Sequence, residues 1–241
     1  MKITVAKDYE ALSREAAHAV IEQVRGKRDS VLVFPGGDTP AGMLRELIEA
    51  SHSQHVDFSD CTFVSLDEWV GLDGSVEGSC RYTLDRLFFK PAPIAPSQIL
   101  FFDAKAANLQ AECRRMDERI AAAGGVDLLV LGIGLNGHIG FNEPGASWDS
   151  LCHVAELDDI TKSVASKYFP NGTDHVHQGI TIGMRHIMES KRVVVLANGE
   201  KKTEIVKKVV HDTGTPAVPA SMLKDHPHCS IIVDEACWNG N

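Results

Sequence analysis

The sequence of 241 residues lacks a surplus of basic charge, a long apolar run and any closely spaced pair of cysteines. Its net charge is −9 and no lysine- or arginine-rich run stands out, so we expect no general binding to nucleic acid or to a membrane surface. No apolar stretch is long enough to cross a membrane, and the polar start of the chain lacks the apolar centre of a signal peptide. Six scattered cysteines without a C-x-x-C pair are typical of reduced thiols, and these features predict a cytoplasmic protein.

Apolar segments of two periodicities alternate along the chain. Leu12, Ala16 and Val20 recur every four residues and predict an amphipathic helix over 8–25, whereas unbroken apolar runs such as VLVF predict buried strands. Strands are expected at 31–34, 62–66, 126–134, 192–198 and 230–236, and further helices at 79–89, 104–124, 200–211 and from about residue 40. The alternation predicts an α/β fold with a Rossmann-like, mostly parallel sheet and helices on both faces.

We expect one domain over residues 1–241, because no linker, repeat or low-complexity tract divides the chain. Residues 144–178 are more polar and less periodic, which fits a small lid segment over the strand ends as well as a plain surface excursion. Ligands of parallel sheets bind at the carboxyl ends of the strands. Four informative segments follow predicted strands, at 36–40, 67–69, 136–143 and 198–201.

The segment PGGDTPAG (35–42) connects a strand to a helix. Gly36 and Gly37 allow the backbone to approach a ligand closely, Thr39 is placed to cap the helix, and Pro40 suits the first helical position. The free N–H groups at that helix end predict an anion site, typically for phosphate. A capped turn without a ligand fits the pattern equally well.

Two lysines follow the strand predicted at 192–198, in the segment NGEKK. Lys201 or Lys202 is placed to reach across to the same anion. The alternative is a pair of solvated lysines on a helix surface. The G-K-S or G-K-T end of a Walker loop is missing from PGGDTPAG, so the anion site is not of that class.

The segment SLDEWVGL (65–72) places two adjacent carboxylates directly after a strand. Neighbouring residues at a strand end point in different directions, so only one of Asp67 and Glu68 is expected to face a site. A half-buried carboxylate whose pKa is raised toward neutrality is suited to act as a general base. A helix cap or a structural ion pair is the alternative for such a pair.

The stretch LGIGLNGHIGFNEPG (131–145) contains the G-x-G-x-x-G spacing of a dinucleotide-binding turn. Such a turn needs a helix that starts inside the glycine pattern, and Gly140 and Pro144 argue against one here. His138 and Glu143 favour a different interpretation, because a histidine oriented by a carboxylate is suited to moving protons at neutral pH. We interpret the stretch as a proton-transfer loop.

No motif of the sequence indicates a metal ion or an organic cofactor. Two H-x-H pairs, His175 with His177 and His226 with His228, have no cysteine or carboxylate at a familiar zinc spacing. We expect these four histidines to lie on the surface. No G-x-S-x-G elbow and no Cys/His arrangement indicates a covalent nucleophile.

Taken together, these segments resemble the glucosamine-6-phosphate deaminase (isomerase) family. The resemblance runs over nearly the whole chain, from PGGDTP to VPASMLKDHP and IIVDEA, and LDEWVGL and GIGLNGHIGFNEPG are its most specific parts. It implies the conversion of an aminohexose 6-phosphate and water to a ketohexose 6-phosphate and ammonia. It implies no cofactor, because the substrate's own amine and carbonyl carry the electron flow.

The resemblance also implies roles for individual residues. Asp67 matches the base that moves a proton between C2 and C1, and His138 matches the acid/base that opens the sugar ring. Asn136 and Glu143 match the partners of that histidine. The residues matched to phosphate binding are Gly36, Gly37 and Thr39 of the turn, Lys201, and Lys167, which stands where some relatives have arginine.

The resemblance leaves several alternatives open. Many members have aspartate in place of Asn136, and an amide adds no charge beside the histidine. The triplet DEW and the segment CHVAELD lean toward a galactosamine-6-phosphate branch, so both epimers are kept as substrates. The other readings are a sugar-lactone hydrolase like the 6-phosphogluconolactonases, in which His138 would activate water, and a sugar-phosphate-binding regulator without activity. We expect a monomer or small homo-oligomer without allosteric activation, because allosteric hexameric relatives have a longer C-terminal segment.

Overall fold

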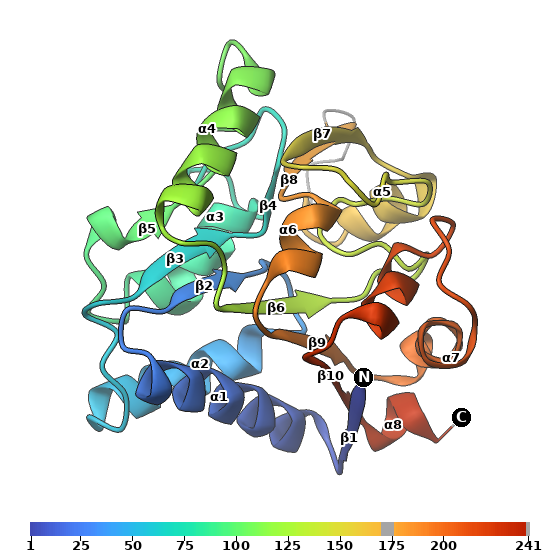
Figure 1. Ribbon diagram of the computed structural model, residues 1–241, viewed down its shortest axis with the longest axis horizontal. Helices are drawn as coiled ribbons and strands as arrows, with labels where there is room; N and C mark the ends of the chain where they lie inside the picture. The colour runs from blue at the N-terminus through green and yellow to red at the C-terminus, as the bar shows by residue number, and fades with distance from the viewer. Residues whose placement is uncertain (170–175, 240–241) are drawn as a thin grey trace.

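The computed structural model describes residues 1–169 and 176–239 (Figure 1). Its centre is a seven-stranded sheet of order β1-β10-β9-β6-β2-β3-β5, in which every neighbouring pair is parallel. The strands are β1 (Lys2–Ala6), β2 (Val31–Phe34), β3 (Thr62–Ser65), β5 (Ile99–Leu100), β6 (Leu128–Gly132), β9 (Val193–Ala197) and β10 (Cys229–Asp234). The predicted α/β fold with a mostly parallel sheet is confirmed.

Helices cover both faces of this sheet (Figure 1). The α-helices are α1 (Tyr9–Gly26), α2 (Ala41–His52), α3 (Cys80–Leu84), α4 (Leu109–Ala122), α5 (Asp159–Ala165), α6 (Met184–Glu189), α7 (Thr203–His211) and α8 (Glu235–Trp238). A π-helical turn, η1 (Asp85–Phe89), extends α3, and the 3-10 turns are η2 (Pro96–Gln98), η3 (Glu200–Lys202) and η4 (Pro219–Asp225). No helix among the described residues has the length and apolar character needed to cross a membrane.

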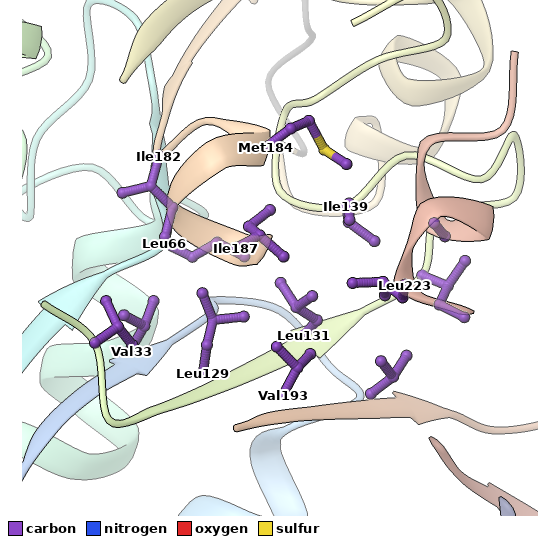
Figure 2. Packing of buried hydrophobic residues seen from close by; sticks show 14 of the residues in the cluster. Val33, Leu66, Leu129, Leu131, Ile139, Ile182, Met184, Ile187, Val193 and Leu223 are labelled. Atoms are coloured by element: carbon purple, nitrogen blue, oxygen red, sulfur yellow. The ribbon is translucent and has the colours of Figure 1, made fainter. Parts of the chain in front are cut away.

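Alternate residues of the central strands belong to two separate cores, because successive side chains of a strand point to opposite faces. Leu129 and Leu131 of β6 pack with α4, α6 and α7, whereas Leu128 and Val130 pack with α1 and α2. Figure 2 shows the first of these cores, in which sheet residues face Ile187 of α6. Burial on both faces explains the unbroken apolar runs of the sequence.

A second, three-stranded antiparallel sheet lies beyond the carboxyl ends of the central strands (Figure 1). Its strands are β4 (Asp67–Trp69), β8 (Gln178–Thr181) and β7 (His153–Glu156). The chain enters it directly from β3, so the segment after β3 is a strand rather than a loop. The predicted lid at 144–178 contains β7, α5 and the first residue of β8, and its residues 170–175 lie outside the described part of the chain.

Candidate active site

A cavity opens where the loops after β2, β3 and β6 approach the antiparallel sheet and α5. The predicted site residues that line it are Gly36, Gly37, Thr39, Asp67, His138 and Lys167. The loops after β2, β3 and β6 therefore meet at the carboxyl edge of the sheet, as the sequence predicts. Three other predicted residues, Asn136, Glu143 and Lys201, do not line the cavity.

The loop after β2 lies on one side of the cavity and leads into α2. Gly37 has a φ of 104°, which favours glycine, and a Cβ on Gly36 would come within 3.1 Å of the Cys80 backbone. The prediction that Thr39 caps α2 is wrong, because the N-cap is Pro40 and no side chain caps the helix. The Thr39 hydroxyl instead lies 3.0 Å from Oδ1 of Asn198, which ties the loop to the end of β9.

The two lysines of the segment NGEKK are placed differently, and the one that faces the cavity is not Lys201. Lys202 lines the cavity and donates to the carbonyl of Ile133, whereas its neighbour Lys201 is exposed outside it. Burial, with a smaller contribution from the charge of Lys167, lowers the pKa of Lys202 to about 8. In the segment NGEKK the second lysine therefore faces the cavity, because the 3-10 turn η3 directs the two side chains differently.

Lys167 reaches the cavity from the segment that follows α5. Its Nζ lies 2.6 Å from Oδ2 of Asp38 in the loop after β2, and 4.5 Å from the centre of the Tyr168 ring. In this structure the lysine therefore pairs with a carboxylate of the loop.

Asp67 and Glu68 point in different directions, as the sequence predicts. Glu68 is buried and accepts hydrogen bonds from the backbone N–H groups of Trp69, Cys80 and Arg81, so it caps α3. Asp67 lines the cavity, and burial raises its pKa to about 7, with the charge of Glu68 adding to the shift. One carboxylate of the pair is thus structural, and the other is suited to proton transfer at neutral pH.

The glycine-rich loop after β6 contains no helix through residue 150, so it is not a dinucleotide-binding turn. Gly137 has a φ of 88°, in the region that favours glycine. A Cβ on Gly134 would lie 2.4 Å from the imidazole of His138, so the ring folds over a position that only glycine can fill. These two glycines shape a tight loop that presents His138 to the cavity.

His138 is held by polar groups at its Nδ1 atom. Its Nδ1 lies 3.5 Å from Oε2 of Glu143 and 3.0 Å from Oγ1 of Thr161, a residue of α5 that no sequence motif indicates. Asn136 donates its amide to Oε2 of Glu143 at 2.9 Å, and its Oδ1 accepts the backbone N–H of His138. Burial opposes the ionised form of Glu143, but the hydrogen bonds and charge of His138 outweigh it and lower the pKa.

The histidines expected on the surface behave differently from one another. His177 and His228 are exposed, and His175 lies outside the described residues. The prediction for His226 is wrong, because the ring is buried, with Nε2 2.8 Å from the carbonyl of Ser190 and Nδ1 accepting the N–H of His228. This histidine satisfies backbone groups in the interior.

One group of side chains in the described part of the chain has the donor atoms of a metal site, away from the cavity. It consists of Asp117, Cys152 and His186, whose possible ligand atoms lie within 4.8 Å of one another. Oδ1 of Asp117 lies 2.7 Å from Nε2 of His186 and accepts the backbone N–H of Cys152. These contacts already satisfy the carboxylate and connect α4, α6 and the loop before β7.

Comparison with known sequences gives one consistent family. The family described as glucosamine-6-phosphate isomerases/6-phosphogluconolactonase matches residues 6–232. A glucosamine-6-phosphate deaminase of a Geobacillus species is 39% identical over 235 residues, which cover 98% of this chain and 94% of the relative. One from Bacillus velezensis is 36% identical over 241 residues and covers both chains fully.

Comparison with solved structures agrees with the sequences. A monomeric glucosamine-6-phosphate deaminase superposes with a TM-score of 0.95 at 34% identity, over 98% of each chain. The 6-phosphogluconolactonase of Trypanosoma brucei superposes with a TM-score of 0.79 at 18% identity, over 98% of this chain and 97% of the other, which shows a shared fold.

Proposed function

This chain belongs to the family of glucosamine-6-phosphate isomerases and 6-phosphogluconolactonases, and from that premise we propose that it is an aminohexose-6-phosphate deaminase. The reaction converts the amino sugar phosphate and water to a ketohexose 6-phosphate and ammonia. The observation that carries the proposal is the presence of two separate proton-transfer groups, Asp67 and His138, on one cavity beside a helix N-terminus.

His138 is proposed to open the sugar ring. The closed pyranose carries its C1 as a hemiacetal carbon, so C2 becomes acidic only after a proton has moved between the anomeric hydroxyl and the ring oxygen. An imidazole titrates near neutrality and carries out both transfers. Glu143 and Thr161 on the Nδ1 side support this role, because they leave Nε2 for the substrate.

Asp67 is proposed to move the second proton. In the open-chain sugar, its carboxylate removes the C2 proton and returns a proton to C1, while a second proton passes from the 2-amine to O1, which leaves an alcohol at C1 and an imine carbon at C2. Water adds there and ammonia departs, so the atoms balance without a cofactor. A carboxyl with a pKa of about 7 is present in both protonation states at neutral pH, and such a group contributes roughly 10²–10⁴-fold.

The 6-phosphate is proposed to bind at the N-terminus of α2. Gly36, Gly37 and Thr39 supply backbone N–H groups at the positive end of a 12-residue helix. Lys202 adds a cationic donor from the opposite wall of the cavity, and we assign to it the role that the sequence suggested for Lys201. Lys167 contributes if a bound phosphate releases it from Asp38.

The curated relatives named glucosamine-6-phosphate deaminases make glucosamine 6-phosphate the first substrate to test. The galactosamine epimer is the second, because Trp69 of the triplet DEW lines the cavity, where its ring lies tilted against Phe141 with centroids 4.6 Å apart. We also propose a cytoplasmic location, which the six free, buried thiols support.

An ammonia-release assay on both epimers tests the proposal, with wild type, Asp67→Asn and His138→Gln. We expect ammonia from wild type and a loss of at least about 10²-fold in kcat for each variant. A lactone hydrolase would use His138 without Asp67 and release no ammonia, and a non-catalytic regulator would bind the sugars unchanged. No ammonia from either epimer refutes the proposal, and full activity of Asp67→Asn refutes the assignment of the base.

A further inference from the structure

The side chain of Cys80 lines the cavity and lies between Asp67 of β4 and Gly36 of the loop after β2. It is the first residue of α3, and both its backbone N–H and its thiol are bound by the adjacent carboxylates of β4. The N–H donates to Oε1 of Glu68 at 2.9 Å, and Sγ donates to Oδ1 of Asp67 at 3.4 Å. On its other side the residue packs against Gly36, which has no Cβ to obstruct the contact.

The contact with Cys80 is the only hydrogen bond that the described residues make to the carboxylate of Asp67. The other oxygen, Oδ2, accepts no hydrogen bond from the described residues, and Asp67 lines the cavity. Burial raises the pKa of the thiol well above its ordinary value, so the sulfur keeps its proton and remains a donor. The two carboxylate oxygens of Asp67 are therefore unequal, because one is fixed by the protein and the other is left for substrate.

We propose that Cys80 is a positioning residue for the proposed deamination, whose S–H holds Oδ1 of Asp67 so that Oδ2 faces the carbon that exchanges its proton. The inference rests on the proposed function for its consequence in catalysis and on the geometry alone for the hydrogen bond. Thiols are weak donors, so the contact orients the carboxylate without stabilising the ionised form as strongly as an N–H or O–H group would.

The pH dependence of the reaction is the readout that separates positioning from mere packing. A donor to the ionised carboxylate favours ionisation, so its removal raises the pKa of Asp67 and moves the acid limb of kcat/KM to higher pH. The titratable groups that face the same space are Glu68 from β4 and, lining the cavity, Asp38, Cys80, His138, Lys167, Tyr168 and Lys202. The variants below leave all of these except Cys80 unchanged.

The experiment compares kcat/KM for ammonia release between pH 5 and 9 in wild type, Cys80→Ala, Cys80→Ser and Cys61→Ala. Cys61 is the matched control, because it is a buried thiol that donates to the Arg28 carbonyl before the opposite end of β3. In Cys80→Ala we expect the acid limb of kcat/KM to move to higher pH by about 0.5–1 pH unit. At pH values below the limb, this shift lowers kcat/KM roughly 3- to 10-fold, while KM at high pH stays nearly unchanged. Serine restores the limb and Cys61→Ala does not move it. Coincident limbs for Cys80→Ala and wild type overturn the proposal.

A second measurement does not depend on activity or on a folded alanine variant. The S–H stretching band of Cys80 is isolated in the infrared as the difference between wild type and Cys80→Ser. We expect a band at the lowered frequency of a bonded thiol, which shifts as Asp67 titrates near pH 7. A band at the frequency of a free thiol that does not change with pH overturns the contact. If wild type releases no ammonia, the deaminase proposal fails, while this band still decides whether Cys80 holds Asp67.

Discussion

At the scale of single residues, the side chains that face the cavity have neighbours of the same type that do not. Asp67 faces the cavity while Glu68 caps a helix, and Lys202 faces it while Lys201 is solvated. Composition does not distinguish the members of either pair. The direction of each side chain at the end of its strand or turn does, and this makes each pair an internal control.

The lysine pair gives a direct prediction for phosphate binding. Replacing Lys202 with methionine removes a half-buried cationic donor from the cavity, and we expect KM to rise roughly 10- to 100-fold, the range of a charge-assisted hydrogen bond. Steady-state kinetics of Lys202→Met and the matched Lys201→Met check this. An equal rise of KM in both variants would show that neither lysine has a privileged position.

The lowered pKa of Lys202 predicts how binding changes with pH. The charged form is the phosphate-binding form, and in the free enzyme it is lost as the pH rises through about 8. We expect KM to increase above pH 8 in wild type, and we expect this increase to be absent in Lys202→Met. A flat KM between pH 7 and 9.5 in wild type would contradict the assignment.

Asp67 links activity to stability with a definite sign. Its pKa is raised from 3.8 to about 7, so its contribution to stability is fully present only below about pH 3.8 and is lost progressively as the pH rises to about 7. Asp67→Asn removes the cost of an ionised buried carboxylate, so we expect its gain in free energy of unfolding over wild type to be roughly 1–4 kcal/mol larger at pH 8 than at pH 5. Thermal unfolding at both pH values measures this. If the stability gain of Asp67→Asn over wild type is smaller at pH 8 than at pH 5, the prediction is wrong.

At the scale of elements, the loop after β6 converts a strand end into a rigid support for one imidazole. Gly134→Ala would place a methyl group 2.4 Å from the ring of His138, with no unusual φ to add strain. We expect kcat to fall about 10-fold or more while the protein stays folded, because a displacement of about 1 Å is enough to cost catalysis. Kinetics and circular dichroism check this against Gly26→Ala, at a position where a Cβ meets nothing within 4 Å. Wild-type kcat in Gly134→Ala would mean that the ring is not fixed by this loop.

The elements that the sequence predicted are those whose pattern arises from burial on both faces. The runs that became β2, β6 and β9 and the periodic helix α1 were identified within two residues at most ends. The edge strand β1 and the short strand β7 were missed because they are partly exposed. The short strand β8 is mostly buried, and it was missed because its sequence QGIT carries no unbroken apolar run. Helix α4 begins at Leu109 rather than 104, because Asn108 caps it.

The candidate site was predictable where a residue lies on a motif at a strand end, and not where tertiary contacts decide. The positions of Asp67 and His138 at the cavity follow from such motifs. Thr161 belongs to α5, which a three-dimensional arrangement alone brings to His138. The Thr39 hydroxyl was assigned to a helix cap, but the distant Asn198 competes for it.

At the scale of the whole molecule, a parallel sheet supplies the chemistry and a smaller antiparallel sheet with α5 closes over it (Figure 1). A solved relative with 34% identity is monomeric, and the prediction for this chain stays a monomer or small homo-oligomer with hyperbolic kinetics. Light scattering after gel filtration and initial rates with and without an acetylated amino-sugar phosphate check this. An oligomer with sigmoidal kinetics relieved by that effector would contradict the prediction.

The most direct measurement of the central claim is product analysis after turnover of glucosamine 6-phosphate, and separately of galactosamine 6-phosphate, in D₂O. Proton transfer from C2 to C1 by a carboxyl group that exchanges with solvent predicts equal amounts of ammonia and ketohexose 6-phosphate, with deuterium at C1 of the ketose. Loss of both ammonia and label in Asp67→Asn would tie the transfer to that residue. Turnover by wild type without ammonia, or ammonia release with no deuterium at C1 under conditions of full solvent exchange, would contradict the mechanism.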